Sequence, residues 1–461
     1  MKINYSKVKL YSLKKLGILI VMSFGIALFH SSTAAQLKTA VVKIDITPTD
    51  SQYLLGYQER KSTGVLDHIY HKILVLDDGK TQFFIVSSDI CLYSPSEYDK
   101  VAAKLKKLYG INPLNFWWCV THTHSAPEFG ATGLYGIYMG DRIQHTVDAA
   151  YTEMIEQKLI DGIAEARSKL TDVTLSVGWG FSQANINRRA IDVNGKASLG
   201  MNPDGPVDRR IGLLRIDKKD GSPLALIANY AIHGTVMSGA NLQISGDAPG
   251  IVAEYVEEKT GAPMLFINGA AGNLAPIYSV YPNARAGHLS EFRVLLGDKI
   301  LEANKNIKSP VENVKLQSDE IVVETPKKPG LPWSSDLKKY AEIKKTGDTL
   351  VRLPVRLLKI NKDIAIWSAP VELFCEVSNE VRSLSPYPFT FYFGYTNGWF
   401  GYLPTKEEWK YGGYEVETVS PFTPHAAGDL STSVVDYLQG MMKVPQMVTD
   451  KPKRKNKKSR N

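Results

Sequence analysis

The chain has 461 residues, 44% of them hydrophobic and 22% charged, an ordinary composition for a globular protein that excludes collagen-like, coiled-coil and wholly disordered chains. Its formal net charge of +8 comes from the two ends, because residues 1–35 hold five lysines and residues 451–461 hold seven basic residues, with no acid in either segment. The remaining residues carry 43 basic against 47 acidic side chains. This argues against a nucleic-acid-binding protein, since such proteins place their positive charge on the folded domain.

The N-terminal segment has the pattern of a secretory signal peptide. Its lysines precede an uncharged apolar run over 16–29, and the small residues at 33–35 offer a cleavage site before Gln36. The run is short for a membrane span, so we expect no stable transmembrane segment. We therefore predict a signal peptide over 1–35, one large domain over 36–450 and a basic disordered tail over 451–461.

The cysteines agree with export to a compartment where disulfides are not required. Only Cys91, Cys119 and Cys375 are present, too few and too widely spaced for a disulfide framework or a clustered cysteine metal site. A large exported protein of this kind suits a bacterial periplasm, so we expect a periplasmic or secreted location.

Three segments show a strand–helix–strand pattern, which predicts an α/β fold with a mixed β-sheet core flanked by helices. In the first, strands over 83–86 and 116–120 enclose a helix. Ser94 and Glu97 form a capping signature at the start of this helix, and Gly110 ends it.

The second and third segments follow the same pattern later in the chain. The second has strands over 224–230 and 264–267 and a helix over 247–259, and the third has strands over 364–367 and 389–393 and a helix over 370–384. Two glycine- and tyrosine-containing stretches, 126–144 and 403–428, are expected to be long functional loops.

Polar side chains gather where these strands end. Binding sites of open α/β sheets lie beyond the carboxyl ends of the strands. The residues at or just after such ends are Asp89, His122, His124, His233, Asn268 and Glu372. We therefore expect them to share one site.

The His122-Thr123-His124 sequence is the strongest chemical signal, since the chain has only nine histidines. In an extended segment, residues two apart point the same way, so both imidazoles can face one point. Imidazole and carboxylate groups are the ligands of catalytic Zn²⁺. The pair is equally compatible with two hydrogen-bonded loop histidines.

The other candidates have ordinary structural explanations when taken singly. His233 fits a core histidine, Glu372 a helix-start carboxylate and Tyr402 a packed aromatic residue. Asp89 and Asp247 fit a strand end and a helix cap, and are also candidates for orienting metal-bound histidines.

An anionic substrate could be held by arginine, whose guanidinium group matches a carboxylate. Arg188 and Arg210 are the candidates, each adjacent to a second arginine, and neighbouring strand residues face opposite ways. The loop that begins at Asn268 is a further candidate for substrate binding, with backbone N–H groups suited to a developing oxyanion, or it is a tight turn that requires glycine.

Six motifs together resemble the catalytic domain of neutral ceramidases. They are Thr-His-Thr-His-Ser at 121–125, Asn-Tyr-Ala-Ile-His at 229–233, Ser-Gly-Asp-Ala-Pro-Gly at 245–250, Asn-Gly-Ala-Ala-Gly-Asn-Leu-Ala-Pro at 268–276, Pro-Val-Glu-Leu-Phe at 370–374 and Asn-Gly-Trp-Phe-Gly-Tyr at 397–402. The resemblance runs from near residue 44 to about residue 440. We expect no counterpart of the immunoglobulin-like C-terminal domain of ceramidases.

The resemblance implies one zinc ion. His122, His233, Glu372 and Tyr402 match the metal ligands of the family, and His124 matches the histidine that assists proton transfer. Where the family pattern has the serine of Gly-Asp-x-Ser-Pro, this chain has Ala275, which has no hydroxyl group. A serine nucleophile is therefore excluded, and we expect that ceramide is not the specific substrate.

Two mechanisms use these residues without serine. In hydrolysis of an amide or ester bond, His124 acts as general base and acid beside a Lewis-acidic metal. The alternative is a carbohydrate lyase or dehydratase that acts in periplasmic polysaccharide degradation. In this enzyme His124 or Tyr402 would move a proton during an elimination reaction at a uronic acid of an oligosaccharide. A third possibility is a non-catalytic binding protein on the same fold. The expected partner is a small-molecule, oligosaccharide or lipid substrate.

Overall fold

The computed structural model describes residues 36–443, apart from 278, 280–285 and 309. The predicted signal peptide and basic tail lie outside the described residues, so the expected division of the chain stays a prediction. None of the helices in the described part has the length and apolarity needed to cross a bilayer.

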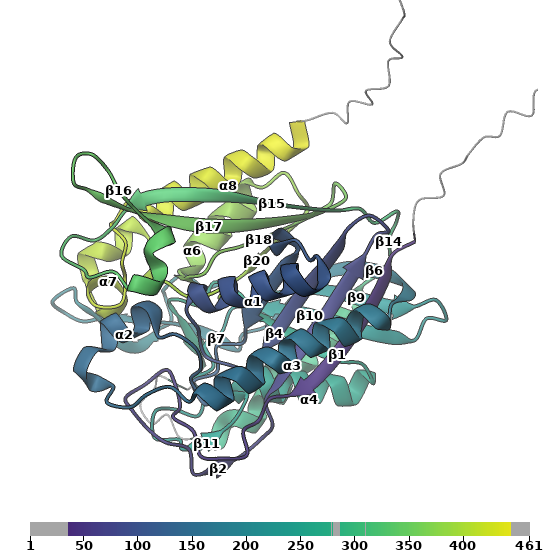
Figure 1. Ribbon diagram of the computed structural model, residues 1–461, viewed down its shortest axis with the longest axis horizontal. Helices are drawn as coiled ribbons and strands as arrows, with labels where there is room; N and C mark the ends of the chain where they lie inside the picture. Colours follow the sequence, from purple (N-terminus) through teal and green to yellow (C-terminus); the bar gives the residue numbers. More distant parts are fainter. Residues whose placement is uncertain (1–35, 278, 280–285, 309, 444–461) are drawn as a thin grey trace, which may run out of the picture. The chain divides into compact units, whose positions relative to one another are not determined.

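A nine-stranded mixed sheet forms the larger part of the fold (Figure 1). Its strand order is β12-β10-β9-β6-β1-β3-β4-β5, with β14 paired to β6. The strands are β1 (Lys38–Asp45), β3 (Tyr70–Asp77), β4 (Gln82–Ser88), β5 (Phe116–Val120), β6 (Thr171–Phe181), β9 (Arg210–Lys218), β10 (Pro223–Tyr230), β12 (Met264–Asn268) and β14 (Pro310–Val311). Within it β4 pairs with β5 and β10 with β12 in parallel, and the other pairs are antiparallel.

A second sheet has five strands in the order β15-β17-β18-β20, with β16 paired to β17. They are β15 (Leu316–Pro326), β16 (Ala341–Ile343), β17 (Thr349–Ile360), β18 (Ile364–Ser368) and β20 (Phe389–Phe393), and only β18 and β20 are parallel. Short strands make smaller sheets near the site: β2 (Gly64–Val65), β7 (Asn185–Ile191), β8 (Ala197–Asn202), β11 (Gln243–Ile244), β13 (Leu274–Pro276), β19 (Glu372–Leu373) and β21 (Tyr402–Leu403).

The two sheets pack face to face, and helices cover their outer faces. The helices are α1 (Pro95–Tyr109), α2 (Gly133–Met139), α3 (Ala149–Ser168), α4 (Asp247–Thr260), α5 (Lys299–Asn306), α6 (Cys375–Leu384), α7 (Tyr414–Glu417) and α8 (Ala426–Lys443). Helices α3, α4 and α5 pack on the nine-stranded sheet, and α1 packs beside α3. Helix α8 packs on β15 and on α6, as Figure 1 shows.

Alternation of side chains along the strands explains this layering. On β4, Phe83 and Ile85 join the core between the sheets, whereas Phe84 and Val86 join the core under the helices. On β18, Ile366 faces the first core and Trp367 the second. Strands that are apolar on both faces therefore require a layer on each side.

The three predicted strand–helix–strand segments are confirmed as β4-α1-β5, β10-α4-β12 and β18-α6-β20, each with parallel strands. The α/β fold class with a mixed sheet is also confirmed. Ser94 is the N-cap of α1, where its hydroxyl accepts from the N–H of Ser96, and Gly110 is its left-handed C-cap.

Two details of the prediction were wrong. Helix α6 begins at Cys375 and not at 370, because Glu372 pairs with Tyr402 of β21 in a two-residue strand instead of starting the helix. The stretches expected to be loops contain α2 and α7, and helix α8 begins at Ala426, inside the second one.

Candidate metal centre and active site

The candidate site lies at the carboxyl ends of the parallel strands, where both sheets contribute. His122 follows β5 and His233 follows β10, both from the nine-stranded sheet. Glu372 follows β18 and Tyr395 follows β20, both from the five-stranded sheet. All four side chains are buried. The expected convergence of strand-end residues is therefore present for these elements.

Hydrogen bonds orient the two histidine rings. His122 donates from Nδ1 to the carbonyl of Cys91 over 2.8 Å, and His233 donates from Nδ1 to the carbonyl of Leu274 over 2.9 Å. Each Nε2 atom is thereby turned toward Glu372, whose Oε2 lies 3.2 Å from that of His122 and 3.1 Å from that of His233. A carbonyl acceptor on the far nitrogen is the usual device that fixes a metal-binding histidine.

This arrangement fits a divalent cation. Because Nδ1 of His233 carries the proton, its buried Nε2 makes no hydrogen bond and points a lone pair at a carboxylate oxygen. Two lone pairs at this distance repel each other unless a positive charge lies between them. The ligand atoms of His122, His233 and Glu372 all lie within 4.8 Å of one another, and two imidazoles with one carboxylate are a common catalytic zinc set.

The ionisation of these groups follows from burial and from each other. Burial opposes a charge on both Glu372 and His122, but the two groups stabilise each other's charges: the pKa of His122 is raised to about 10, and its positive charge holds the pKa of the Glu372 carboxyl group well below its usual range. A metal ion at this position would therefore displace a proton from His122. Burial and the Arg188 guanidinium lower the pKa of His233 to about 3, so its imidazole is neutral, as a metal ligand must be. Glu372 is further fixed by Trp399, which donates from Nε1 to Oε1 over 2.9 Å, and by the hydroxyl of Tyr395 at 3.4 Å.

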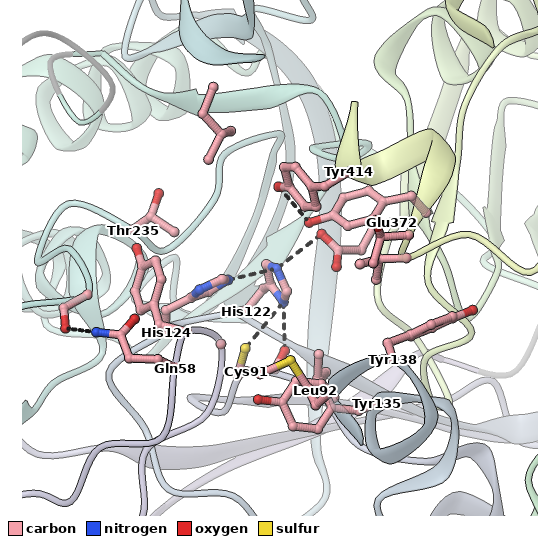
Figure 2. A pocket seen from close by; sticks show the side chains of 18 of the residues that line it. Gln58, Cys91, Leu92, His122, His124, Tyr135, Tyr138, Thr235, Glu372 and Tyr414 are labelled. Atoms are coloured by element: carbon pink, nitrogen blue, oxygen red, sulfur yellow. Dashed lines mark hydrogen bonds and ion pairs between the residues drawn. The ribbon is translucent and has the colours of Figure 1, made fainter. Parts of the chain in front are cut away.

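His124 lies beside the donor set without belonging to it. Its Nε2 is 3.2 Å from Nε2 of His122, and in Figure 2 His122 lies between His124 and Glu372. The expected extended geometry is wrong, because β5 ends at Val120 and His122 has a left-handed backbone with φ 62°. The two rings still approach each other. The backbone N–H of His124 donates to the carbonyl of Gly234, and this bond joins the turn that carries His122 and His124 to the segment that follows His233.

A second cluster surrounds the tyrosine that was predicted as a ligand. Arg188 donates from Nη2 to the hydroxyls of Tyr402 (3.0 Å) and Tyr414 (2.7 Å) and to the carbonyl of Gly272 (2.9 Å). Its Nε lies 3.4 Å from a carboxylate oxygen of Glu415, which balances its charge. The neighbouring Arg189 pairs with Glu408 and with the other carboxylate oxygen of Glu415.

Several of these side chains, though not His233, line a cavity of about 660 Å³. Its walls include His122, His124, Arg188, Glu372 and Tyr402, together with aromatic and aliphatic side chains from the 133–139 helix and from the 399–419 region. Ala275 also lines it, from β13. The methyl group of Ala275 therefore faces the cavity at the position where the family pattern has serine.

The remaining predicted site residues lie outside this cavity. Asn268 is fully buried and its amide bonds to the backbone of Thr121 and Ile232, so the predicted substrate contact has no support from these bonds. Three backbone N–H groups of its loop, those of residues 269, 272 and 274, also donate to protein carbonyls. Arg210 is exposed at the start of β9 and does not line the cavity.

Asp247 and Asp89 form hydrogen bonds with backbone N–H groups and not with the histidine rings that they were predicted to orient. Asp247 accepts from the N–H groups of Val236, Met237 and Ala248, and so shapes the turn after His233. Asp89 accepts from the N–H of Tyr70, and burial raises its pKa to about 6. No bond joins either one to a histidine ring in the described part of the chain.

Sequence reasoning missed three residues that hold the site. Tyr395 stacks on the His122 ring with centroids 4.2 Å apart, and Cys91 supplies the carbonyl that orients it. Arg60 donates to the carbonyl of His124. Cys91 follows a strand end and could have been found there, whereas nothing near Arg60 in the sequence signals its role.

The fold and site together define an α/β protein with a candidate metal centre at the carboxyl edge of its sheets. Residues 39–276, more than half of the chain, match the N-terminal domain of the neutral/alkaline non-lysosomal ceramidases. The chain belongs to this family.

Individual relatives agree with this assignment. The chain is 27% identical over 257 residues to neutral ceramidase B of Dictyostelium discoideum, covering 53% of this chain and 34% of the relative. It is 26% identical over 255 residues to the neutral ceramidase of Pseudomonas aeruginosa, covering 52% and 37%. These matches span about a third of the length of the relatives. The crystal structure of the Pseudomonas aeruginosa enzyme shares the fold, with a TM-score of 0.72 at 20% identity over 89% of this chain and 76% of that one.

Proposed function

We propose that this protein is an exported, zinc-dependent hydrolase of an amide or ester bond that is related to ceramidases but not specific for ceramide. The observation that carries the proposal is the convergence of two oriented imidazole nitrogens and one carboxylate oxygen at the end of a cavity. His122, His233 and Glu372 would hold the ion, with Tyr402 as the fourth ligand. When bound, the ion supplies Lewis-acid polarisation of a carbonyl group and activation of water.

The side chains around this centre can perform the proton transfers. His124 has its Nε2 directed at the donor set, from where it can take a proton from the attacking water and return it to the leaving nitrogen or oxygen. Arg188 donates to the hydroxyls of both Tyr402 and Tyr414, so only one hydroxyl proton is used between them and the other can be donated to an oxyanion. Ala275 contributes no nucleophile, so water is the expected attacking group.

The proposal is tested by metal content and turnover together. We expect about one zinc ion per chain by elemental mass spectrometry, and hydrolysis of N-acyl and O-acyl substrates that chelation abolishes and zinc restores. His233→Ala and Glu372→Gln should lose both the metal and the activity. His68→Gln, an exposed histidine that does not line the cavity, is the matched control and should retain both.

His124→Gln separates proton transfer from metal binding. Its kcat should fall by roughly 10²–10⁴-fold while the metal content stays unchanged. Full activity without metal would contradict the proposal. A product with a new ultraviolet-absorbing double bond would replace hydrolysis by elimination, and metal binding without turnover of any substrate would favour a binding protein.

A further inference from the structure

A second, much smaller cavity lies next to the segments that carry Glu372 and its hydrogen-bond partners. It has a volume of about 10 Å³, close to the room that one water molecule needs in a protein interior. Arg356 of β17 and Ser368 of β18 line it, and they are direct cross-strand partners, so their side chains share one face of the five-stranded sheet. Asn397 lines it as well, and its backbone N–H donates to the carbonyl of Trp118 in β5 of the nine-stranded sheet.

Each of these three side chains has a buried polar atom that lacks a hydrogen-bond partner in the described part of the chain. The atoms are Nη1 of Arg356, Oγ of Ser368 and Nδ2 of Asn397. Ser368 is 1% exposed and Asn397 is 5% exposed, so bulk solvent does not reach them. The orientation of the Asn397 amide follows from its other atom, because Oδ1 accepts from the N–H of Trp118 over 2.8 Å. Buried polar groups are costly unless they are hydrogen-bonded, so three of them on residues that line one cavity indicate a bound polar molecule.

The charges around this small cavity indicate that the bound molecule is neutral. Nε of Arg356 lies 2.8 Å from a carboxylate oxygen of Glu320, which balances the charge of the guanidinium group. Guanidinium and amide nitrogens can only donate hydrogen bonds, whereas the hydroxyl of Ser368 can also accept one. A water molecule that accepts two hydrogen bonds and donates one satisfies all three atoms, and three is the usual number of bonds of a buried water.

The small cavity lies beside both segments that fix the carboxylate of Glu372. Ser368 precedes Glu372 by four residues in the chain. Asn397 lies midway between Tyr395, whose hydroxyl is 3.4 Å from Oε2 of Glu372, and Trp399, whose Nε1 donates to Oε1 over 2.9 Å. A molecule that joins Ser368 to Asn397 therefore ties the carboxylate of Glu372 to the side chains that hold it.

We propose that one water molecule binds in this small cavity and positions the Glu372 carboxylate for metal binding. The water accepts hydrogen bonds from Arg356 and Asn397 and donates one to Ser368, and so joins β17 and β18 to the segment 395–399. The water site stands by itself, whereas its effect on Glu372 rests on the proposed zinc-dependent function. Ser368 and Asn397 do not line the catalytic cavity, so they are positioning residues that act through the hydrogen bonds of a metal ligand.

A high-resolution crystal structure of the full chain tests the water site. We expect one density peak within about 3.2 Å of Nη1 of Arg356, Oγ of Ser368 and Nδ2 of Asn397. A second crystal soaked in bromide distinguishes water from a halide ion, because bromide scatters anomalously. A bromide peak in the small cavity, or a cavity without density, would overturn the proposal.

Ser368→Val tests the positioning effect, because the larger apolar side chain fills the small cavity and excludes the water. The zinc affinity of the folded variant, measured by competition with a chromophoric chelator, should fall by about tenfold, the lower end of the effect of losing a group that orients a metal ligand. Ser368→Ala leaves room for the water and removes one of its three partners, so it should show a smaller loss. Ser431→Ala, at a buried serine of α8 that does not line the small cavity, is the control and should keep the wild-type affinity.

An unchanged zinc affinity in both Ser368 variants would overturn the positioning role. If Ser368→Val does not fold, Ser368→Ala decides the role by the same measurement. If the wild type binds no zinc, the failure belongs to the proposed function, and crystal structures of the Ser368 variants decide the inference. Loss of the hydrogen bond between Trp399 and Glu372 in these structures supports it, and an unmoved Glu372 carboxylate overturns it.

Discussion

The position of His124 depends on a neighbour without a side chain. Gly56 has φ +107°, and a Cβ atom there would lie 2.4 Å from Nδ1 of His124. Gly56→Ala should therefore displace the imidazole and lower kcat by roughly 10²-fold, the effect of a misplacement of about 1 Å. Steady-state kinetics measures this, with metal content as a second readout that should stay unchanged.

Gly110→Ala is the matched control for backbone strain. Gly110 also has a positive φ, +70°, but a Cβ atom there meets nothing within 4 Å, and it ends α1. This variant should lose about 1 kcal/mol of unfolding free energy and keep its kcat. Equal losses of kcat in both variants would show that strain alone, and not contact with His124, is responsible.

The site residues that sequence reasoning identified share a property: each lies in a short motif that follows a local strand signal. His122, His233 and Glu372 are of this kind, and the structure brings them together. Tyr395 also follows a strand, but its contact with His122 joins residues 273 positions apart, and Arg60, which follows no strand signal, acts on a residue 64 positions away. Long-range partners of this kind cannot be found from a single sequence.

Among the elements, the connection over 126–148 is held by ion pairs of His145, and the stability that these pairs contribute should depend on pH. His145 lies between Glu59, 2.6 Å from its Nδ1, and Glu128 at its Nε2. Burial opposes protonation of His145, but its hydrogen bonds to the two carboxylates raise its pKa above the ordinary 6.5. The stabilisation is therefore fully present below about pH 6.5, while the carboxylates are ionised, and is lost as the pH rises through the raised pKa.

Chemical denaturation of the wild type and His145→Gln between pH 5.5 and 9 measures this effect, with pH values chosen around the ordinary histidine pKa of about 6.5. The difference in unfolding free energy should be largest at the acidic end and should shrink as the pH rises. A difference that is the same at every pH would show that the stacking of His145 on Tyr53, with centroids 3.7 Å apart, matters and that the charge does not.

The secondary-structure elements, like the site residues, divide into those that a local sequence signal predicts and those that depend on distant contacts. Strands β5 and β20 were predicted with their observed limits because compact apolar runs and a preceding capped helix or turn mark them. The β19–β21 pair was missed because its two strands are only two residues long and lie about 30 residues apart, so that Glu372 reads locally as a helix start. Helix α8 could have been found from Leu430, Val434 and Leu438, which recur every four residues and are buried.

At the scale of the whole molecule, the candidate metal centre joins the two sheets. The histidines follow strands of the nine-stranded sheet, whereas Glu372 and Tyr402 come from segments that leave the five-stranded sheet. Hydrogen bonds already join the sheets at this edge: the N–H of Val120 donates to the carbonyl of Tyr395, the N–H of Gly394 donates to that of Asn268, and Asn229 of β10 donates to carbonyls of β12 and β20. An ion bound by ligands from both sides would therefore act as a cross-link between the sheets.

Metal binding should consequently stabilise the entire described unit against unfolding and not the site alone. Zinc at about 100 times its dissociation constant should add about 2.7 kcal/mol to the unfolding free energy of the wild type relative to the chelated protein. Glu372→Gln should abolish this increment, because it removes the only ligand of the three-residue donor set that follows the five-stranded sheet. Glu258→Gln, at an exposed glutamate on α4, should keep it. A zinc-dependent increment that survives in Glu372→Gln would mean that Glu372 does not hold the ion.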